Sequence, residues 1–309
     1  MNKIIVVGSY SKALFFNNKR IPSIGETVTA HGFFETFGGK GSNQAVTAAK
    51  LGAEVEFICK VGTDHYGNEA IGMYKECGLY GPGILSDATE PTSIGVITVD
   101  EQGNNAISIC LGANEKLTAE EVVDFIKNQE QKPFIVGFQL ENSPEMVIQA
   151  IKACSEMGLD VLLDPAPVAP LPDWIYPHLT YIKPNEHEAA LLSGITIKTP
   201  EDAFEAGRWF LKAGVKKAII TLGEQGTVCV TPDHEQYFPP IRVNAVDTTG
   251  AGDVFSGSLM KALADEMPLD DAIVYANCAA SLSVTKPGVV ESIPTVEEVQ
   301  ALYTTRKEL

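Results

Sequence analysis

Residues 246–255 combine the side chains and backbone that anion binding and proton transfer need. Gly250, Ala251 and Gly252 directly precede Asp253 and an apolar stretch typical of a helix. The first N–H groups of a helix have no partner within it, and together with the helix dipole they favour an anion. A carboxylate in that first turn could accept a proton from a hydroxyl that attacks a bound phosphoryl group. The alternative is an ordinary helix cap, a position where Asp is common.

A second glycine-rich segment, residues 37–43, reads FGGKGSN and precedes an amphipathic stretch. It lacks the spacing of a Walker A loop, which needs four residues between its glycines and Ser or Thr after its Lys. A tight backbone turn at Gly39 would project Lys40 and Asn43, which suits a ligand with several hydroxyl groups. The alternative interpretation is a plain turn between a strand and a helix.

Short apolar stretches rich in branched residues alternate with helical patterns along the chain. This alternation predicts a mostly parallel sheet with helices on both faces, which is a doubly wound, three-layer α/β fold. Ligands of such folds bind outside the carboxyl ends of the strands. The expected strands are Ile4–Val7, Val55–Cys59, Phe134–Gly137, Val161–Asp164, Tyr181–Lys183 and Ala218–Thr221, and the expected helices are Gly41–Leu51, Gly67–Glu76, Pro144–Met157, Glu186–Leu192, Pro200–Ala213 and Gly252–Ala264.

Residues 12–37 and 92–110 break this alternation. The first segment contains no convincing helix, and Thr92–Val99 with Ala106–Cys110 predict a hairpin. We expect both segments to form a small β-sheet lid, inserted in a single domain that spans residues 1–309. The alternative is two ordinary surface loops.

The predicted lid would expose apolar side chains. Ile107 and Ile109 alternate with smaller residues and are expected on its outer face. Because an exposed apolar sheet is a pairing hazard, we expect two lids to pair in a homodimer.

Composition excludes several classes of protein. The formal net charge is −17, so a broad basic surface for nucleic acid is not expected. No apolar run approaches the roughly 18 residues that a membrane-spanning helix requires. The 6 cysteines form no CxxC pair, which indicates reduced thiols rather than disulfides or a metal site. We therefore expect a cytoplasmic protein that binds neither nucleic acid nor membrane.

The two glycine-rich motifs, their order and their separation resemble the ribokinase-like (PfkB) family of carbohydrate kinases. The signatures are residues 37–43 and 247–253, and the likeness runs from residues 6–9 through 25–27 to 287–288. The resemblance implies a doubly wound core with a β lid. It also implies transfer of the γ-phosphate of ATP to a hydroxyl of a ribose-like sugar, with the small-molecule sugar as partner. Asp253 would be the base, and the amides of the preceding turn would stabilise the developing charge.

The resemblance also implies which residues bind the ligands. Sugar contacts are expected from Ser11, Gly39, Lys40, Asn43, Glu141 and Asp253. ATP contacts are expected from Asn185, Thr221, Gly223, Gly226, Gly252 and Asn277. Glu188 would hold Mg²⁺ through water, since Mg²⁺ keeps most of its water ligands. A K⁺ ion beside the anion site would be bound by Asp247, Thr249, Lys286, Gly288 and Ser292.

One segment departs from the family pattern. After Gly8 and Ser9 the pattern has Asn-x-Asp, whose Asp accepts hydrogen bonds from two sugar hydroxyls, whereas this chain has Ser11, Lys12 and Ala13. We therefore expect weak use of ribose. The alternatives are a kinase for another polyol, a nucleoside or a sugar acid, or a catalytically weak regulatory protein that senses a sugar. Lys12 is interpreted either as a contact for an acidic substrate group or as a solvated loop residue.

Overall fold

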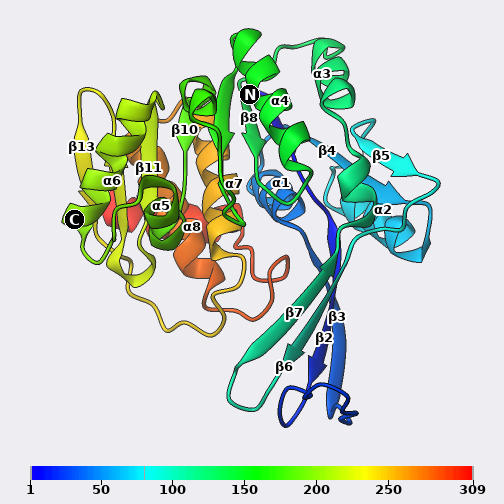
Figure 1. Cartoon of the computed structure of the whole chain (residues 1–309). Coiled ribbons are helices and arrows are strands. Elements are labelled where there is room, and N and C mark those ends of the chain that lie inside the picture. Colours follow the sequence, from blue (N-terminus) through cyan, green and yellow to red (C-terminus); the bar gives the residue numbers. More distant parts are fainter. Residues whose placement is uncertain (1, 80, 308–309) are drawn as a thin grey trace.

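A large mixed sheet forms the centre of the structure, which is a computed structural model that describes residues 2–79 and 81–307 (Figure 1). Its nine strands lie in the order β13-β12-β11-β10-β9-β8-β1-β4-β5. In this spatial order, the strands from β11 through β10, β9, β8, β1 and β4 to β5 pair in parallel with their neighbours. At the other end of the sheet, β12 pairs antiparallel with β11, and β13 pairs antiparallel with β12. The strands are β1 (Ile4–Val7), β4 (Val55–Gly62), β5 (Ile84–Asp87), β8 (Ile135–Phe138), β9 (Asp160–Leu163), β10 (Tyr181–Ile182), β11 (Lys217–Thr221), β12 (Thr227–Val230) and β13 (Glu235–Phe238).

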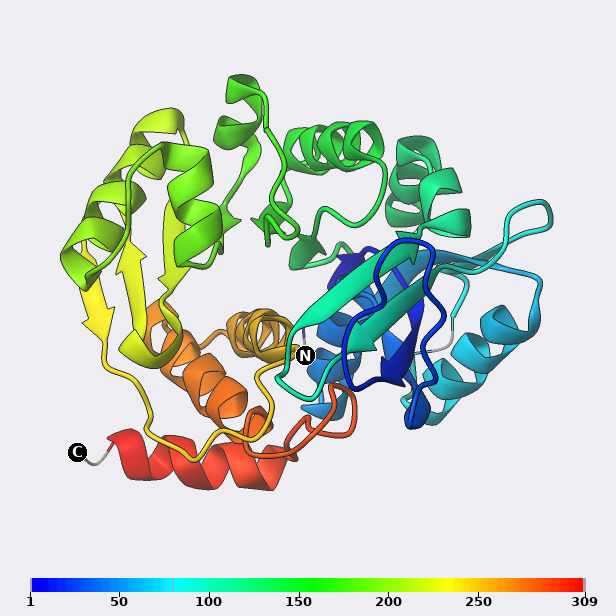
Figure 2. The same cartoon turned by 60° about the horizontal axis from the view of Figure 1, so that its bottom comes forward.

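Helices cover both faces of the large sheet, and Figure 2 shows α3 to α6 on the side opposite α8 and α9. Strand β1 explains the arrangement, because its side chains alternate between two separate apolar cores. Ile4 and Val6 pack in one core, and Ile5 and Val7 pack in the other. The helices are α1 (Lys40–Lys50), α2 (His65–Glu76), α3 (Ala119–Lys127), α4 (Pro144–Glu156), α5 (Glu186–Ser193), α6 (Pro200–Ala213), α7 (Ala251–Ala264), α8 (Leu269–Ser283) and α9 (Val296–Lys307), with 3-10 turns η1 (Gly112–Lys116), η2 (Asp173–His178) and η3 (Gly223–Gln225).

Several elements lie outside the stretches that the apolar pattern indicated. They are the strands β5, β12 and β13 and the helices α3, α8 and α9. Strands β5 and β13 are at the two edges of the sheet, where they are partly exposed and carry polar residues. An edge strand needs no continuous apolar run, so its sequence does not mark it clearly. None of the described helices has the length and apolar character to cross a membrane.

A second, four-stranded sheet projects from the α/β body (Figure 1), and we call it the lid sheet. Its strand order is β3-β2-β6-β7. In its register Ala13 lies beside Gly95, and Gly95 lies beside Ile109, so these residues share one face. Lys12 points to the opposite face. The strands are β2 (Ser11–Asn17), β3 (Gly32–Gly38), β6 (Ile94–Val99) and β7 (Asn105–Cys110).

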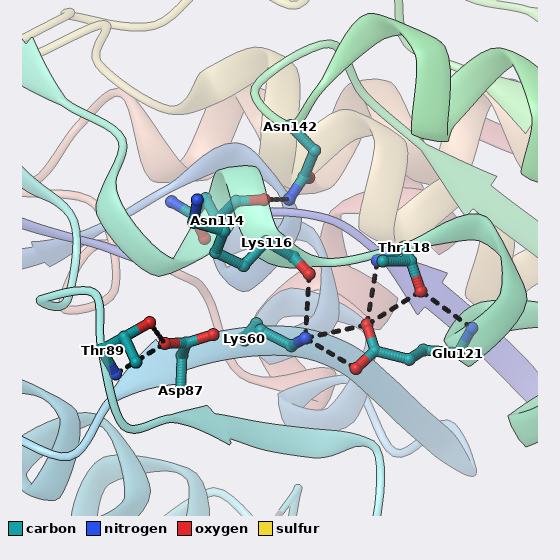
Figure 3. A network of polar contacts seen from close by, with 8 residues as sticks. All are labelled: Lys60, Asp87, Thr89, Asn114, Lys116, Thr118, Glu121 and Asn142. Carbon is teal, nitrogen blue, oxygen red and sulfur yellow. Dashed lines mark hydrogen bonds and ion pairs between the residues drawn. The ribbon is translucent and has the colours of Figure 1, made fainter.

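Polar contacts fix the point where β7 returns to the body (Figure 3). Lys60 on β4 donates to the carbonyl oxygen at the end of η1 and to both carboxylate oxygens of Glu121 on α3. The side-chain amide of Asn142 donates to the backbone carbonyl of Asn114 in η1. The last strand of the lid sheet therefore joins the body through an anchored turn.

Candidate active site

The start of α7 holds a buried carboxylate. Asp253 is 4% exposed and lies in the first turn of α7, whose N-cap is Gly250 with a left-handed φ of 76°. Two amide side chains of α1 donate to it: Asn43 Nδ2 at 2.8 Å and Gln44 Nε2 at 3.2 Å. The two glycine-rich motifs, distant in sequence, therefore meet at Asp253.

Burial raises the pKa of Asp253 by penalising the carboxylate form. The nearby ammonium of Lys40 opposes this shift, and the carboxylate of Asp164 adds to it. The pKa of Lys40 is raised in turn, chiefly because Asp253 attracts its positive charge. A desolvated carboxylate next to a fixed cation is suited to accept a proton from a bound hydroxyl.

Backbone N–H groups at the same helix start are available to an anion. The N–H groups of Gly250 and Gly252 donate no hydrogen bond to any described residue. The N–H of Ala251 is directed at the carbonyl of Thr248, but at a long 3.3 Å. A Cβ on Gly250 would lie 2.5 Å from the side chain of Val289, so no larger residue fits there. This turn can therefore hold an anion beside Asp253.

Glu141 secures the turn that opens α1. Its Oε2 accepts hydrogen bonds from the backbone N–H of Lys40 at 2.7 Å and from Ser9 Oγ at 2.5 Å. Gly39 has a φ of 93°, and a Cβ there would lie 2.7 Å from the Cα of Tyr10. The structure thus brings the expected sugar contacts Gly39, Lys40 and Glu141 together, and shows that Glu141 is tied to the turn.

A polar cluster that the sequence analysis missed lies behind Asp253. Asp164 Oδ2 accepts hydrogen bonds from Lys183 Nζ at 2.9 Å, Gln44 Nε2 at 3.0 Å and Ser256 Oγ at 2.9 Å. Asp164 Oδ1 is buried and has no partner among the described residues. Asp164 and Lys183 directly follow β9 and β10, and adjacent parallel strands end at the same edge of a sheet. That position was the sequence signal that could have revealed them.

An open cleft of about 980 Å³ extends from this anion-binding turn. Two of its residues, Asn185 and Glu188, form a reciprocal capping box at the start of α5. Burial raises the pKa of Glu188. The side chain of Asn277 is held by a hydrogen bond from Thr227. All of the expected ATP contacts line this cleft: Asn185, Thr221, Gly223, Gly226, Gly252 and Asn277.

The residues expected to bind K⁺ are only partly brought together. Asp247 accepts hydrogen bonds from the N–H groups of Thr249 at 2.9 Å and Gly288 at 3.1 Å. Burial alone would raise the pKa of Asp247, but these hydrogen bonds outweigh it and lower the pKa. Ser292 donates to the carbonyl of Val289 within the same loop. Lys286 differs from the other candidates, because its side chain is directed away to Glu298. It could therefore bind K⁺ only through its backbone.

Comparison with known proteins identifies this arrangement. The profile described as pfkB family carbohydrate kinase matches residues 1–296. The chain belongs to this family. A ribokinase of Staphylococcus aureus (strain COL) is 36% identical over 300 residues, which cover 96% of this chain and 98% of that protein. A deoxyribokinase of Salmonella typhi is 34% identical, with 96% of each chain covered.

This kinase also shares its fold with solved relatives. A structure of Arabidopsis thaliana ribokinase complexed with ribose and ATP matches with a TM-score of 0.89 and 30% identity, covering 98% of both chains. The predicted doubly wound core with a β lid is confirmed. The protein is an ATP-dependent sugar kinase of the ribokinase-like type.

The lid segment that departs from the family pattern requires one correction. Lys12 is not a solvated loop residue and is not directed at a substrate, because it is 5% exposed and its Nζ lies 2.6 Å from Glu69 Oε2. Ser11 Oγ accepts a hydrogen bond from Ser93 Oγ at 3.0 Å. Ala13 shares the face of Ser11. This face of β2 in the kinase therefore presents one hydroxyl and one methyl group.

The register of the lid sheet gives the position of Ile109. In the register it shares a face with Ala13, opposite the face of Lys12 that contacts α2. Ile107 and Ile109 are 57% and 58% exposed. These two exposed isoleucines of the kinase therefore lie on the face of the lid sheet that carries Ser11 and Ala13.

Proposed function

We propose that this kinase transfers the γ-phosphate of ATP to a hydroxyl of a ribose-like sugar, with Asp253 as the general base. The observation that carries the proposal is the buried carboxylate of Asp253 beside the N–H groups of Gly250 and Gly252, which have no partner in the described chain. The relatives named ribokinase and the neighbour complexed with ribose and ATP support the sugar class.

The residues support a direct, in-line transfer. Asp253 accepts the proton of the sugar hydroxyl while the oxygen of that hydroxyl forms a bond to the γ-phosphorus. The bond from that phosphorus to the bridging oxygen breaks, and ADP leaves with the electron pair. The N–H groups of the turn at 250–252 and the ammonium of Lys40 stabilise the charge on the transferred group, which is commonly the largest catalytic contribution. Glu141 and Asn43 line the sugar pocket.

The site also fits the metal ions that the family implies. Buried Asp164 Oδ1 has no partner among the described residues, and Glu188 lies in the same cleft, so both offer oxygen atoms to the water shell of Mg²⁺. When bound, Mg²⁺ neutralises phosphate charge. The carboxylate of Asp247, next to the loop that contains Gly288 and Ser292, fits K⁺ through carboxylate and carbonyl oxygens. Its place against Gly250 would order the anion-binding turn.

A second candidate is a kinase for a substrate other than ribose. The observation that favours it is the face of β2 with Ser11 and Ala13, which offers no carboxylate to a pair of vicinal hydroxyls. Another polyol or a nucleoside remains compatible with this face. A sugar acid is disfavoured, because the cation of Lys12 is already paired on the opposite face of the strand.

We also propose that the enzyme is a homodimer joined through its lid sheets. Phe34, Ile107 and Ile109 share the face of this sheet that carries Ser11 and Ala13, and each is at least 48% exposed. Pairing of two sheets would remove these apolar side chains from water.

A panel of sugars tests the function. The panel contains ribose, 2-deoxyribose, other pentoses and hexoses, nucleosides and sugar acids, and release of ADP is measured for each compound. Turnover of a pentose that is lost in Asp253→Asn supports the proposal. Absence of turnover with every compound, while a sugar still binds, would instead support the regulatory protein that senses a sugar.

A further inference from the structure

One ion-paired cluster links the lid sheet to the body. Lys12 Nζ on β2 lies 2.6 Å from Glu69 Oε2 on α2 and 3.2 Å from Glu35 Oε2 on β3. Within residues 2–79 and 81–307, Lys12–Glu69 is the sole ion pair between the lid sheet and the α/β body. The cluster therefore joins the lid sheet to α2 across a junction where the described residues form no second ion pair.

Aromatic rings close the cluster around the ammonium. Lys12 Nζ lies 5.0 Å from the ring centre of Phe37 and 5.5 Å from that of Tyr66, distances at which a cation is attracted to a ring face. A buried charge is costly unless it is paired, so this lysine has a strong preference for the position where both glutamates reach it. Hydrogen bonding and charge from Glu69 and Glu35 outweigh burial and raise the pKa of Lys12, so the ammonium remains charged.

The strand is also fixed just before Lys12. Asn114 Oδ1 accepts the N–H of Tyr10 at 3.2 Å, and Asn114 Nδ2 donates to the carbonyl of Tyr10 at 2.8 Å. The backbone is thus held at Tyr10, and the next contact that fixes it to α2 is made by Lys12. Ser11 and Ala13 are on either side of Lys12 and point to the opposite face. Because Ser11 and Ala13 flank Lys12 on β2, a shift of this strand relative to α2 would also move these two side chains.

We propose that Lys12 is a positioning residue for the sugar site. Its ion pairs with Glu69 and Glu35 hold the first strand of the lid sheet against α2 and so fix the positions of Ser11 and Ala13, the side chains that the proposed function places beside the sugar. The kinetic form of this proposal rests on the proposed function, because it requires that the sugar binds under the lid sheet. The conformational form does not require a known substrate.

The test compares Lys12→Met and Glu69→Gln with the wild-type enzyme. Methionine keeps the apolar stem and removes the charge. We expect the KM for the best sugar to rise about fivefold or more, the usual scale for coupling between a site and a remote contact. The KM for ATP and kcat should change by less than about twofold, because the cleft and Asp253 are untouched. Lys152→Met, which breaks an exposed pair with Glu156 at 3.8 Å on α4, is the matched control.

Hydrogen exchange provides a second measurement without a substrate. Amides of β2 and β3 should exchange faster in Lys12→Met than in the wild type, while those of β1 and β8 stay protected. The double variant with Glu69→Gln should be no worse than Lys12→Met alone, since both remove one interaction. Equal rises in the KM values for sugar and ATP, or unchanged exchange in the lid sheet, would overturn the proposal. If Lys12→Met fails to fold, Lys12→Arg must keep the low sugar KM and Glu69→Gln must raise it. Should the wild type phosphorylate no sugar, the proposed function fails while the exchange result still decides the role of Lys12.

Discussion

Replacing Asp253 with Asn removes the proposed base with little change of shape. Loss of a general base usually lowers kcat by about 10²–10⁴. At about 1.36 kcal/mol per decade, this equals roughly 2.7–5.4 kcal/mol of lost transition-state stabilisation. The new amide would place an N–H₂ against one of the donors, Asn43 or Gln44. Asn43 can rotate its side-chain amide so that its Oδ1, which has no partner among the described residues, accepts a hydrogen bond from the new N–H₂ group. The geometry of the site should therefore survive.

The folding stability of Asp253→Asn should not fall along with its kcat. The pKa of Asp253 is raised by burial, so the folded protein binds this proton more tightly than the unfolded chain does. The stability that this provides is complete below the ordinary aspartate pKa of 3.8 and is lost as the pH rises through the raised pKa. We expect the melting temperature of Asp253→Asn at pH 7 to equal or exceed that of the wild type, with a smaller difference near pH 4.

The assay measures kcat and KM by ADP release, ATP affinity by calorimetry, and melting temperature at both pH values. Asp202→Asn, at an exposed helix cap of α6, is the control for a general effect of losing a carboxylate. ATP binding should remain close to the wild-type value. Turnover by Asp253→Asn within about tenfold of wild type would refute the base assignment, and a large drop in melting temperature would refute the explanation of the raised pKa.

Three further predictions concern the surrounding sites. Replacing K⁺ by Na⁺ should lower kcat at least as much as it raises KM, and Asp247→Ala should remove the difference between the salts; equal rates of the wild type in both salts would argue against the site. Ser11→Asn combined with Ala13→Asp should improve kcat/KM for ribose about tenfold or more, from one or two regained hydrogen bonds; no gain in steady-state assays would show that another group already makes the contact. Ile107→Asp together with Ile109→Asp should convert the proposed dimer to a monomer in light scattering, and a wild-type protein that is already monomeric at micromolar concentration would contradict the proposed pairing.

The local parts of the site could be predicted from the sequence. Gly250, Gly252 and Asp253 are neighbours in the chain, so a helix that starts there must place amides and a carboxylate together. The turn at Gly39 and Lys40 is equally local. The strands β1, β4, β8 and β9 were visible because strands buried on both faces must be apolar throughout.

Other features depend on which segments meet in space. Asp164, Lys183 and Gln44 look unremarkable in sequence, and they form one cluster only because two strand ends and the start of α1 converge there. Lys12 was misinterpreted for the same reason. A lysine between Ser11 and Ala13 reads as a solvent-exposed residue in the sequence. Lys12 is buried because it pairs with Glu69, which comes from another element.

The sequence by itself therefore determined the fold class, the family and the residues of the glycine-rich turn before Asp253, because these are set by periodic burial and by short motifs. The tertiary structure alone decided which charges are paired, which face of the lid sheet each side chain occupies, and how Asp253 is desolvated. Pairing and desolvation depend on distances between residues far apart in the chain, and a one-dimensional pattern carries no such distances. Only the register of the lid sheet shows that Ala13 and Ile109 lie on one face and Lys12 on the other.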